Sequence, residues 1–152
     1  MRLEGKKALI IGAAGQNNMG QSIARRLMQE GAEVCVAGRN KVILEELAKE
    51  LNGHYALSDI TIKSDIETMV DVAVSNLGKI DIAVNATGWG LTKKFLKTNE
   101  EEINRMMALQ FKGPYFFMQS VISEMRNNGG GSIIQISSGT AVLPTINHTA
   151  YA

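Results

Sequence analysis

The chain alternates short apolar runs with longer stretches of helical periodicity, and this alternation limits its fold more than any other feature. Five runs are typical of strands, at 7–11, 33–37, 54–57, 80–84 and 132–137. Four stretches space their apolar residues as helices do, at 19–29, 42–51, 64–77 and 100–126. Strand–helix–strand units form parallel sheets with helices on both faces. The sequence therefore predicts a doubly wound α/β fold for a single domain over residues 1–152.

Local signals predict where several of these helices begin or bend. Asn40 precedes the second helix as an N-cap. The pairs Ser64–Glu67 and Thr98–Glu101 have capping-box spacing before the third and fourth helices. The dipeptide Gly113–Pro114 lies inside the fourth stretch, where we expect a kink or local unwinding.

Composition excludes several classes of protein. Of the residues, 45% are apolar and 20% charged, and 16 basic residues against 15 acidic ones give a net charge of +1. With no basic block, neither a nucleic acid nor a membrane surface is expected as a partner. The single Cys35 has no partner for an internal disulfide, and we expect it to be buried in a reducing compartment. The chain has neither a signal-peptide core nor a membrane-length apolar stretch, so we expect a cytoplasmic protein.

The first strand runs directly into a glycine-rich loop, IIGAAGQNNMG, at residues 10–20. Gly12, Gly15 and Gly20 leave backbone N–H groups accessible just before a helix N-terminus, which is the combination that a pyrophosphate needs. Asn17 or Asn18 is positioned to cap that helix. The spacing differs from the usual G-x-G-x-x-G, and on this pattern alone a plain strand–helix turn remains an alternative.

The second strand ends at Gly38, where dinucleotide-binding domains that use NAD commonly carry an acidic residue for the ribose 2′-hydroxyl. The next residue is Arg39, whose guanidinium is suited to a 2′-phosphate. This pair favours NADP as the cofactor, with NAD possible. The alternative is that Arg39 is an ordinary solvated cation of the loop.

With these motifs in order, the chain resembles the short-chain dehydrogenase/reductase family along its whole length. The resemblance rests on the glycine loop, on SDI at 58–60, NATG at 85–88, LQFKG at 109–113, ISSGTA at 136–141 and the closing YA. It implies a Rossmann-type sheet and a cofactor site made of Gly12, Gly15, Asn18, Met19, Gly20, Arg39, Asp59, Ile60, Asn85, Ala86 and Gly88. In the family, the aspartate that matches Asp59 holds the adenine amino group.

The resemblance also implies a reaction, which is hydride transfer between a nicotinamide and a carbonyl or alcohol carbon of a small molecule. Tyr151 would act as the general acid/base on the substrate oxygen, and Ser138 would orient that oxygen by a hydrogen bond. Gln110 matches the family asparagine that anchors a relay water, with one more methylene in its side chain. No metal is expected, because His54, His148 and Cys35 have no ligand spacing.

Two departures from the family pattern leave alternatives open. The family places a lysine four residues after the tyrosine, whereas this sequence ends at Ala152. One alternative is therefore a nucleotide-binding or regulatory remnant without catalysis. The glycine loop is also two residues longer than the common form and matches the enoyl-thioester-reductase branch in length. An enzyme of that type is the second alternative.

A polypeptide that ended at Ala152 would lack the later strands and helices of the family. Its fifth strand would be an unprotected sheet edge. The helix at 100–126 would also expose apolar side chains such as Phe111 and Tyr115. We expect such a polypeptide to be poorly soluble or a homo-oligomer, either a dimer or a tetramer.

Overall fold

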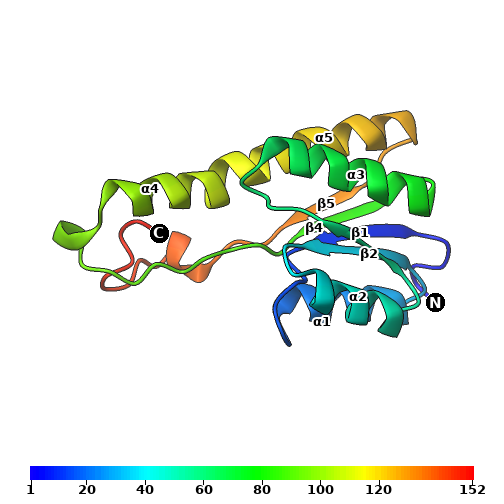
Figure 1. The fold of residues 1–152 in the computed structure, drawn as a ribbon, viewed down its shortest axis with the longest axis horizontal. Helices are drawn as coiled ribbons and strands as arrows, with labels where there is room; N and C mark the ends of the chain where they lie inside the picture. The colour runs from blue at the N-terminus through cyan, green and yellow to red at the C-terminus, as the bar shows by residue number, and fades with distance from the viewer.

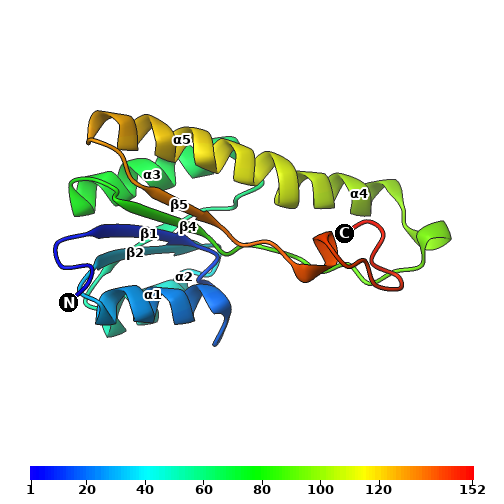
Figure 2. The same ribbon diagram turned by 180° about the vertical axis from the view of Figure 1, so that it is seen from behind.

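The computed structural model describes all of residues 1–152 and contains a five-stranded parallel sheet between two layers of helices (Figures 1 and 2). The strands are β1 Lys7–Ile11, β2 Glu33–Gly38, β3 His54–Leu57, β4 Ile82–Asn85 and β5 Ser132–Gln135. The α-helices are α1 Met19–Gln29, α2 Lys41–Glu50, α3 Lys63–Leu77, α4 Glu100–Met107 and α5 Gly113–Asn127. A π-helical segment, η2 Ala108–Lys112, joins α4 to α5, and short 3₁₀ turns lie at η1 Phe95–Lys97 and η3 Gly139–Ala141. The predicted doubly wound fold is confirmed.

The strand order is β3-β2-β1-β4-β5, so β1 is the central strand and every neighbouring pair is parallel. After β1, the chain adds β2 and then β3 on one side of it. It then crosses the sheet, so that β4 lies on the other side of β1. In both views α1 and α2 cover one face of the sheet while α3 and α5 cover the other (Figures 1 and 2). The order reverses between β1 and β4, and the carboxyl ends of these strands are where an open α/β sheet binds its ligands.

The strands are apolar at consecutive positions because both faces of the sheet are covered. In β1, Leu9 and Ile11 belong to the core under α3 and α5, whereas Ala8 and Ile10 belong to the core over α1 and α2. All four side chains are at most 1% exposed. Edge strand β5 differs, since its Ile134 is 44% exposed. No helix is long and apolar enough to cross a membrane.

The irregularity expected at Gly113–Pro114 is present, but it lies in the turn before these residues. The Gly113 N–H bonds to the carbonyl of Ala108, five residues back, as in a π-helix. Pro114 follows in the first turn of α5 and has no N–H to continue the ordinary ladder. A side chain at Gly113 would place its Cβ 2.4 Å from the Ile60 carbonyl oxygen. Glycine is therefore required where α5 crosses the loop after β3.

One predicted helix start is right and another is wrong. Asn40 caps α2, its side chain accepting a hydrogen bond from the Ile43 N–H. The capping box at Ser64 and Glu67 is not formed, because α3 already begins at Lys63 and no side chain caps it. Glu67 instead pairs with Lys63 at 3.4 Å along the helix surface.

The second predicted capping box is shifted by one residue. The side chain of Asn99 accepts from the Glu102 N–H at 2.9 Å, and the Glu102 carboxylate accepts from the Asn99 N–H at 3.0 Å. Thr98 donates its hydroxyl to the Lys94 carbonyl and so belongs to the preceding 3₁₀ turn. The box therefore consists of Asn99 and Glu102 rather than Thr98 and Glu101.

Asp81 lies immediately before β4 and connects the start of β4 to the start of β1 at the amino edge of the sheet. Its carboxylate accepts from the Lys7 N–H and from the Lys79 ammonium, both at 2.9 Å. Burial acts to raise the pKa of Asp81, but these hydrogen bonds and the charges of Lys79 and Lys6 hold it below its ordinary value.

We predict that Asp81→Asn lowers the free energy of unfolding at pH 7 by about 1–2 kcal/mol, since the hydrogen bonds to a charged group are weakened. Because the folded-state pKa of Asp81 is depressed, its contribution is present above the ordinary value of 3.8 and is lost as pH falls through the lower folded value. Urea unfolding at pH 7 and at acidic pH should show the two proteins converging in acid. Asp71→Asn, on the exposed surface of α3, is the control and should change stability by less than about 0.5 kcal/mol. An equal deficit for Asp81→Asn at both pH values would contradict the prediction.

Candidate functional site

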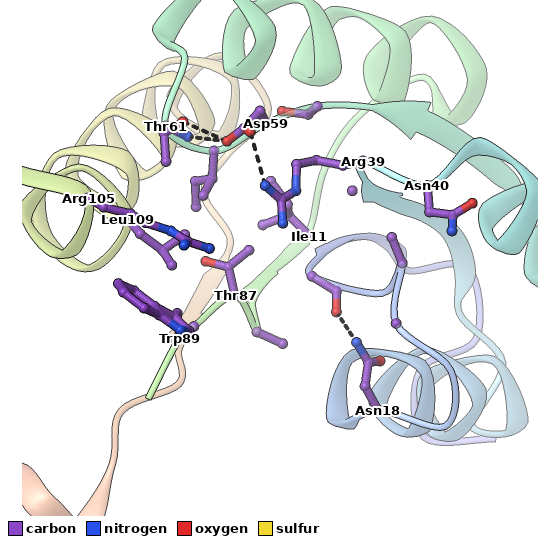
Figure 3. A pocket seen from close by; sticks show the side chains of 18 residues that line it. Ile11, Asn18, Arg39, Asn40, Asp59, Thr61, Thr87, Trp89, Arg105 and Leu109 are labelled. Carbon is purple, nitrogen blue, oxygen red and sulfur yellow. Dashed lines mark hydrogen bonds and ion pairs between the residues drawn. The ribbon is translucent and has the colours of Figure 1, made fainter. Parts of the chain in front are cut away.

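A cleft of about 500 Å³ lies at the carboxyl ends of the central strands, at the reversal of strand order. Figure 3 shows its walls, which come from the loops after β1, β2, β3 and β4 and from α4. The lining residues are Ile11, Gly12, Ala14, Gly15, Asn18, Gly38, Arg39, Asn40, Ser58, Asp59, Ile60, Thr61, Ala86, Thr87, Gly88, Trp89, Arg105 and Leu109.

Most of the residues expected to bind a cofactor are brought together in this cleft. The ones that line it are Gly12, Gly15, Asn18, Arg39, Asp59, Ile60, Ala86 and Gly88. Three others do not line it. Met19 is 58% exposed at the start of α1, Gly20 is buried beneath the loop, and Asn85 is fully buried at the end of β4. Their expected cofactor roles stay predictions.

The glycine loop is shaped by two close backbone contacts. Gly12 has a φ of +97°, and a Cβ there would lie 2.5 Å from the Ala86 carbonyl carbon. A Cβ on Gly20 would lie 2.5 Å from the Gly12 carbonyl oxygen. Since neither position has room for a side chain, α1 begins directly against the end of β1. The N-terminus of α1 carries no acidic residue in its first turn, and its N-cap Asn18 lines the cleft.

Asn18 fastens this loop to α1. Its side-chain amide donates to the Gly12 carbonyl at 2.7 Å, and its side-chain oxygen accepts from the Gln21 N–H at 3.0 Å. Of the two asparagines proposed as N-cap, it is therefore Asn18 that caps α1. Gln21 also holds the loop, which the sequence did not predict. Its side chain is 4% exposed and donates to the Ala13 carbonyl at 3.2 Å.

Arg39 and Asp59 meet across the part of the cleft between β2 and β3. The guanidinium of Arg39 donates to the Asp59 carboxylate at 3.4 Å, and the Thr61 N–H and hydroxyl donate to the other carboxylate oxygen (Figure 3). Burial acts to raise the pKa of Asp59, but these hydrogen bonds and the charge of Arg39 hold it below its ordinary value. The side chain of Arg39 is 73% exposed, so its guanidinium has room for a second anion.

Gly38 explains why no acidic side chain stands at the end of β2. A Cβ at this position would lie 2.6 Å from the Cβ of Ala14 in the glycine loop. The loop therefore packs where an acidic side chain would otherwise stand, and the first side chain available at this end of β2 is Arg39.

Hydrogen bonds between its own residues fix the conformation of the loop after β4. The Asn85 side-chain oxygen accepts from both the N–H and the hydroxyl of Thr87, at 2.9 and 2.7 Å. The Asn85 amide nitrogen is buried without a partner in the protein. Asn85 thus shapes the loop that carries Ala86 and Gly88 into the cleft.

The far wall of the cleft contains residues that were not predicted to bind the cofactor. Arg105 of α4 lies over the ring of Trp89, with its guanidinium carbon 4.1 Å from the ring centroid. Leu109 of η2 lines the same wall. Trp89 follows the NATG motif and is a visible signal in the sequence, but nothing in the spacing of Arg105 indicates that it faces this tryptophan.

The expected catalytic residues lie outside the cleft lining. Gln110 is closest, since it donates to the Trp89 carbonyl at 3.5 Å from the π-helical segment. Ser138 follows β5, and its hydroxyl oxygen accepts from the Thr140 N–H and hydroxyl. Tyr151 lies in the final segment, which runs beneath α4 beyond the carboxyl edge of the sheet (Figures 1 and 2). Their catalytic roles stay predictions.

His148 holds the segment that carries Tyr151. One ring nitrogen is 3.0 Å from the Thr92 hydroxyl and the other is 2.8 Å from the Thr145 hydroxyl. The imidazole and the Tyr151 ring are neighbours, with centroids 6.1 Å apart. A backbone bond from the Lys93 N–H to the Asn147 carbonyl, at 2.7 Å, ties the same two segments. No pattern in the sequence predicts these contacts.

The structure contains no group of three or more His, Cys, Asp and Glu side chains that could hold a metal ion. Cys35 is fully buried in β2, as expected, and burial raises the pKa of its thiol to about 12. A thiol with this pKa stays protonated at neutral pH and is a poor nucleophile.

An open parallel sheet, a glycine loop before α1 and a cleft at the strand reversal together define a Rossmann-type domain. The family model described as short chain dehydrogenase matches residues 6–152. The chain belongs to this family, as the motifs in the sequence suggested.

Relatives and a solved structure support the assignment. An uncharacterized oxidoreductase of Staphylococcus epidermidis RP62A is 31% identical over 152 residues, which cover 99% of this chain and 65% of that protein. An uncharacterized oxidoreductase of Staphylococcus aureus MW2 is 29% identical, with the same coverage of both chains. A crystal structure of the F189W actinorhodin polyketide ketoreductase with NADPH is 25% identical and superposes with a TM-score of 0.90, covering 96% of this chain and 58% of that one. The chain thus spans slightly less than two thirds of the length of the two staphylococcal relatives and somewhat more than half of the ketoreductase.

We predict that Asn18→Ala lowers the free energy of unfolding by about 1–2 kcal/mol, because the cap of α1 and the bond to Gly12 are both lost. Asn18→Asp should retain much of that stability, because its carboxylate still accepts from the Gln21 N–H. Denaturant unfolding of the three proteins measures the difference. Asn17→Gly is the control, since Asn17 has a φ of +49° and its side chain makes no hydrogen bond. An Asn18→Ala protein as stable as the wild type would refute the role of Asn18.

Proposed function

We propose that the chain is the nucleotide-binding part of an NAD(P)-dependent oxidoreductase that acts on a small-molecule carbonyl or alcohol. The observation that carries this proposal is the cleft at the strand reversal, where eight of the residues expected to contact the cofactor lie together. Its support is the match to the short-chain dehydrogenases and the likeness to a ketoreductase solved with NADPH.

The cleft has the form that a dinucleotide requires. The glycine loop, of which Gly12, Gly15 and Asn18 line the cleft, and the N-terminus of α1 that follows it suit a pyrophosphate. Asp59 and Ile60 lie beside each other at the end of the cleft that would receive the adenine. A bound nicotinamide would supply the hydride acceptor or donor of the reaction.

NADP is the preferred cofactor in this proposal, and NAD a possible one. Arg39 lies at the end of β2 with most of its side chain exposed, and the packing of Gly38 against Ala14 excludes an acidic side chain there. A 2′-phosphate would share the guanidinium of Arg39 with Asp59, because a guanidinium has five N–H donors.

Three residues would carry the chemistry. Tyr151 would donate or accept the proton at the substrate oxygen, and Ser138 would orient that oxygen. Gln110, which lies in the π-helical segment and donates to the Trp89 carbonyl, would hold a water of the proton path. The Ser138 hydroxyl oxygen accepts two bonds from Thr140, which leaves its own proton free to donate to a substrate oxygen.

The proposed protein is a homo-oligomer. Met107, Phe111, Tyr115 and Ile122 are 46–60% exposed and recur at helical spacing along η2 and the helices that it joins, on one outward face. A stripe of this kind is suited to pair with the same stripe of a second copy.

Arg39→Gln tests the cofactor preference. We predict that it weakens NADPH binding about tenfold or more and leaves NADH binding nearly unchanged, because only NADPH places a phosphate beside Arg39. Calorimetric titration of the intact protein with both cofactors gives the ratio. Arg126→Gln, at the exposed end of α5, removes the same charge away from the cleft and should alter neither affinity. An unchanged ratio for Arg39→Gln would mean that Arg39 is an ordinary loop cation.

Tyr151→Phe tests catalysis separately from binding. We predict that kcat falls by about 100-fold or more with a panel of ketones and aldehydes, because the general acid/base is removed while NADPH still binds. Tyr55→Phe is the matched control, since the Tyr55 hydroxyl donates to Glu45 of α2 and neither residue lines the cleft. If the wild type bound NADPH without reducing any carbonyl in the panel, the nucleotide-binding remnant would be the better description.

A further inference from the structure

Two guanidinium groups enter the cleft from different walls. Arg39 comes from the end of β2, whereas Arg105 comes from α4 (Figure 3). Asp59 is the one acidic residue among those that line the cleft, and it is already paired with Arg39 at 3.4 Å. The positive charge of Arg105 therefore has no counter-charge within the cleft.

Arg105 is held in place without using its hydrogen-bond donors. Its guanidinium carbon lies over the Trp89 ring, 4.1 Å from the ring centroid, and a cation–π contact of this kind leaves the N–H groups available to a ligand. It forms no ion pair, although Glu101 and Glu102 lie four and three residues earlier on α4. Glu102 is occupied by the Lys93 ammonium at 2.6 Å and by the Asn99 N–H.

The wall formed by Arg105 and Trp89 faces the glycine loop. Figure 3 places these two side chains on one side of Thr87 and places Asn18, with the loop after β1, on the other. The N-terminus of α1, which has no acidic residue in its first turn, presents positive charge from the loop side. An anion between the two walls would be contacted by backbone N–H groups on one side and by a guanidinium on the other.

We propose that Arg105 is a phosphate-binding residue, which holds the pyrophosphate of the dinucleotide from the side opposite the glycine loop. The proposal rests on the proposed function, since it concerns the same cleft. Arg39 remains the partner of the 2′-phosphate, because it stands at the end of β2 rather than across from α1. Trp89 acts as the platform that fixes the guanidinium before the ligand arrives.

The test compares Arg105→Gln with Arg126→Gln in the intact protein, titrated with NADPH, NADH, ADP and adenosine. We expect Arg105→Gln to raise the dissociation constants of NADPH, NADH and ADP about tenfold, because each carries the diphosphate. Adenosine affinity should not change, and Arg126→Gln should behave as the wild type with all four. The loss with ADP should shrink as salt is added. Arg105 is exposed, so thermal unfolding of both variants should match that of the wild type.

A second pair of variants tests the platform. Trp89→Phe keeps an aromatic face under the guanidinium and should bind ADP nearly as the wild type does. Trp89→Leu removes that face and should weaken ADP binding severalfold, whereas adenosine affinity stays the same. In the Arg105→Gln background the same Trp89→Leu change should have little further effect on ADP, because the two residues act together.

Several results would overturn the assignment. Wild-type affinity of Arg105→Gln for ADP and both cofactors would remove Arg105 from the site. A loss confined to NADPH would assign it to the 2′-phosphate instead. A higher KM for a carboxylate-bearing carbonyl substrate, with cofactor affinities unchanged, would assign the anion to the substrate. If the wild type bound none of the four nucleotides, the proposed function would fail, and the pyrophosphate assignment with it.

Discussion

The close contact of Gly12, Gly20 and the loop after β4 is the constraint on which the rest of the site depends. The Gly12 backbone passes so near Ala86 that a Cβ would lie 2.5 Å from its carbonyl carbon, and Gly20 passes equally near Gly12. These contacts bring the start of α1 and the end of β4 against the end of β1. The position of the cleft therefore follows from the packing of these backbone segments rather than from any one side chain.

Most of the fold could be predicted from the sequence because the strands of a sheet covered on both faces are apolar at consecutive positions, and such runs are easy to recognise. The short run at 54–57, for example, is present as β3 His54–Leu57. The errors concern choices between neighbouring polar residues. The sequence does not show that the Thr98 hydroxyl is used by the preceding turn, which leaves Asn99 to cap α4. Such competition is decided by the path of the chain before the helix, and local spacing does not record it.

The residues of the site also fall into those that the sequence predicts and those that it does not. Residues that follow strands directly, such as Arg39 and Asp59, could be assigned to the cleft because the carboxyl ends of parallel strands share one edge. Arg105 could not, since it lies in the last turn of α4, away from the strand ends, and helical spacing does not show that its side chain faces the cleft. Gln21 was missed for another reason: it is a buried polar residue on a helix face, and its role comes from its hydrogen bonds to the Ala13 carbonyl and the Asn17 N–H, which the sequence does not show.

The two halves of the proposed active site are held together by different physical means. The nucleotide half is held by close contacts between backbone segments and by the hydrophobic core that packs against β1. The segment that carries Tyr151 is attached through His148 to Thr92, and through one backbone bond at Lys93, at positions that are at least partly exposed. Exposed hydrogen bonds contribute little to stability because water competes for them. The nucleotide half is therefore constrained by the fold itself, whereas the position of Tyr151 depends on a few polar contacts that ligand binding or further packing can readjust at little cost in free energy.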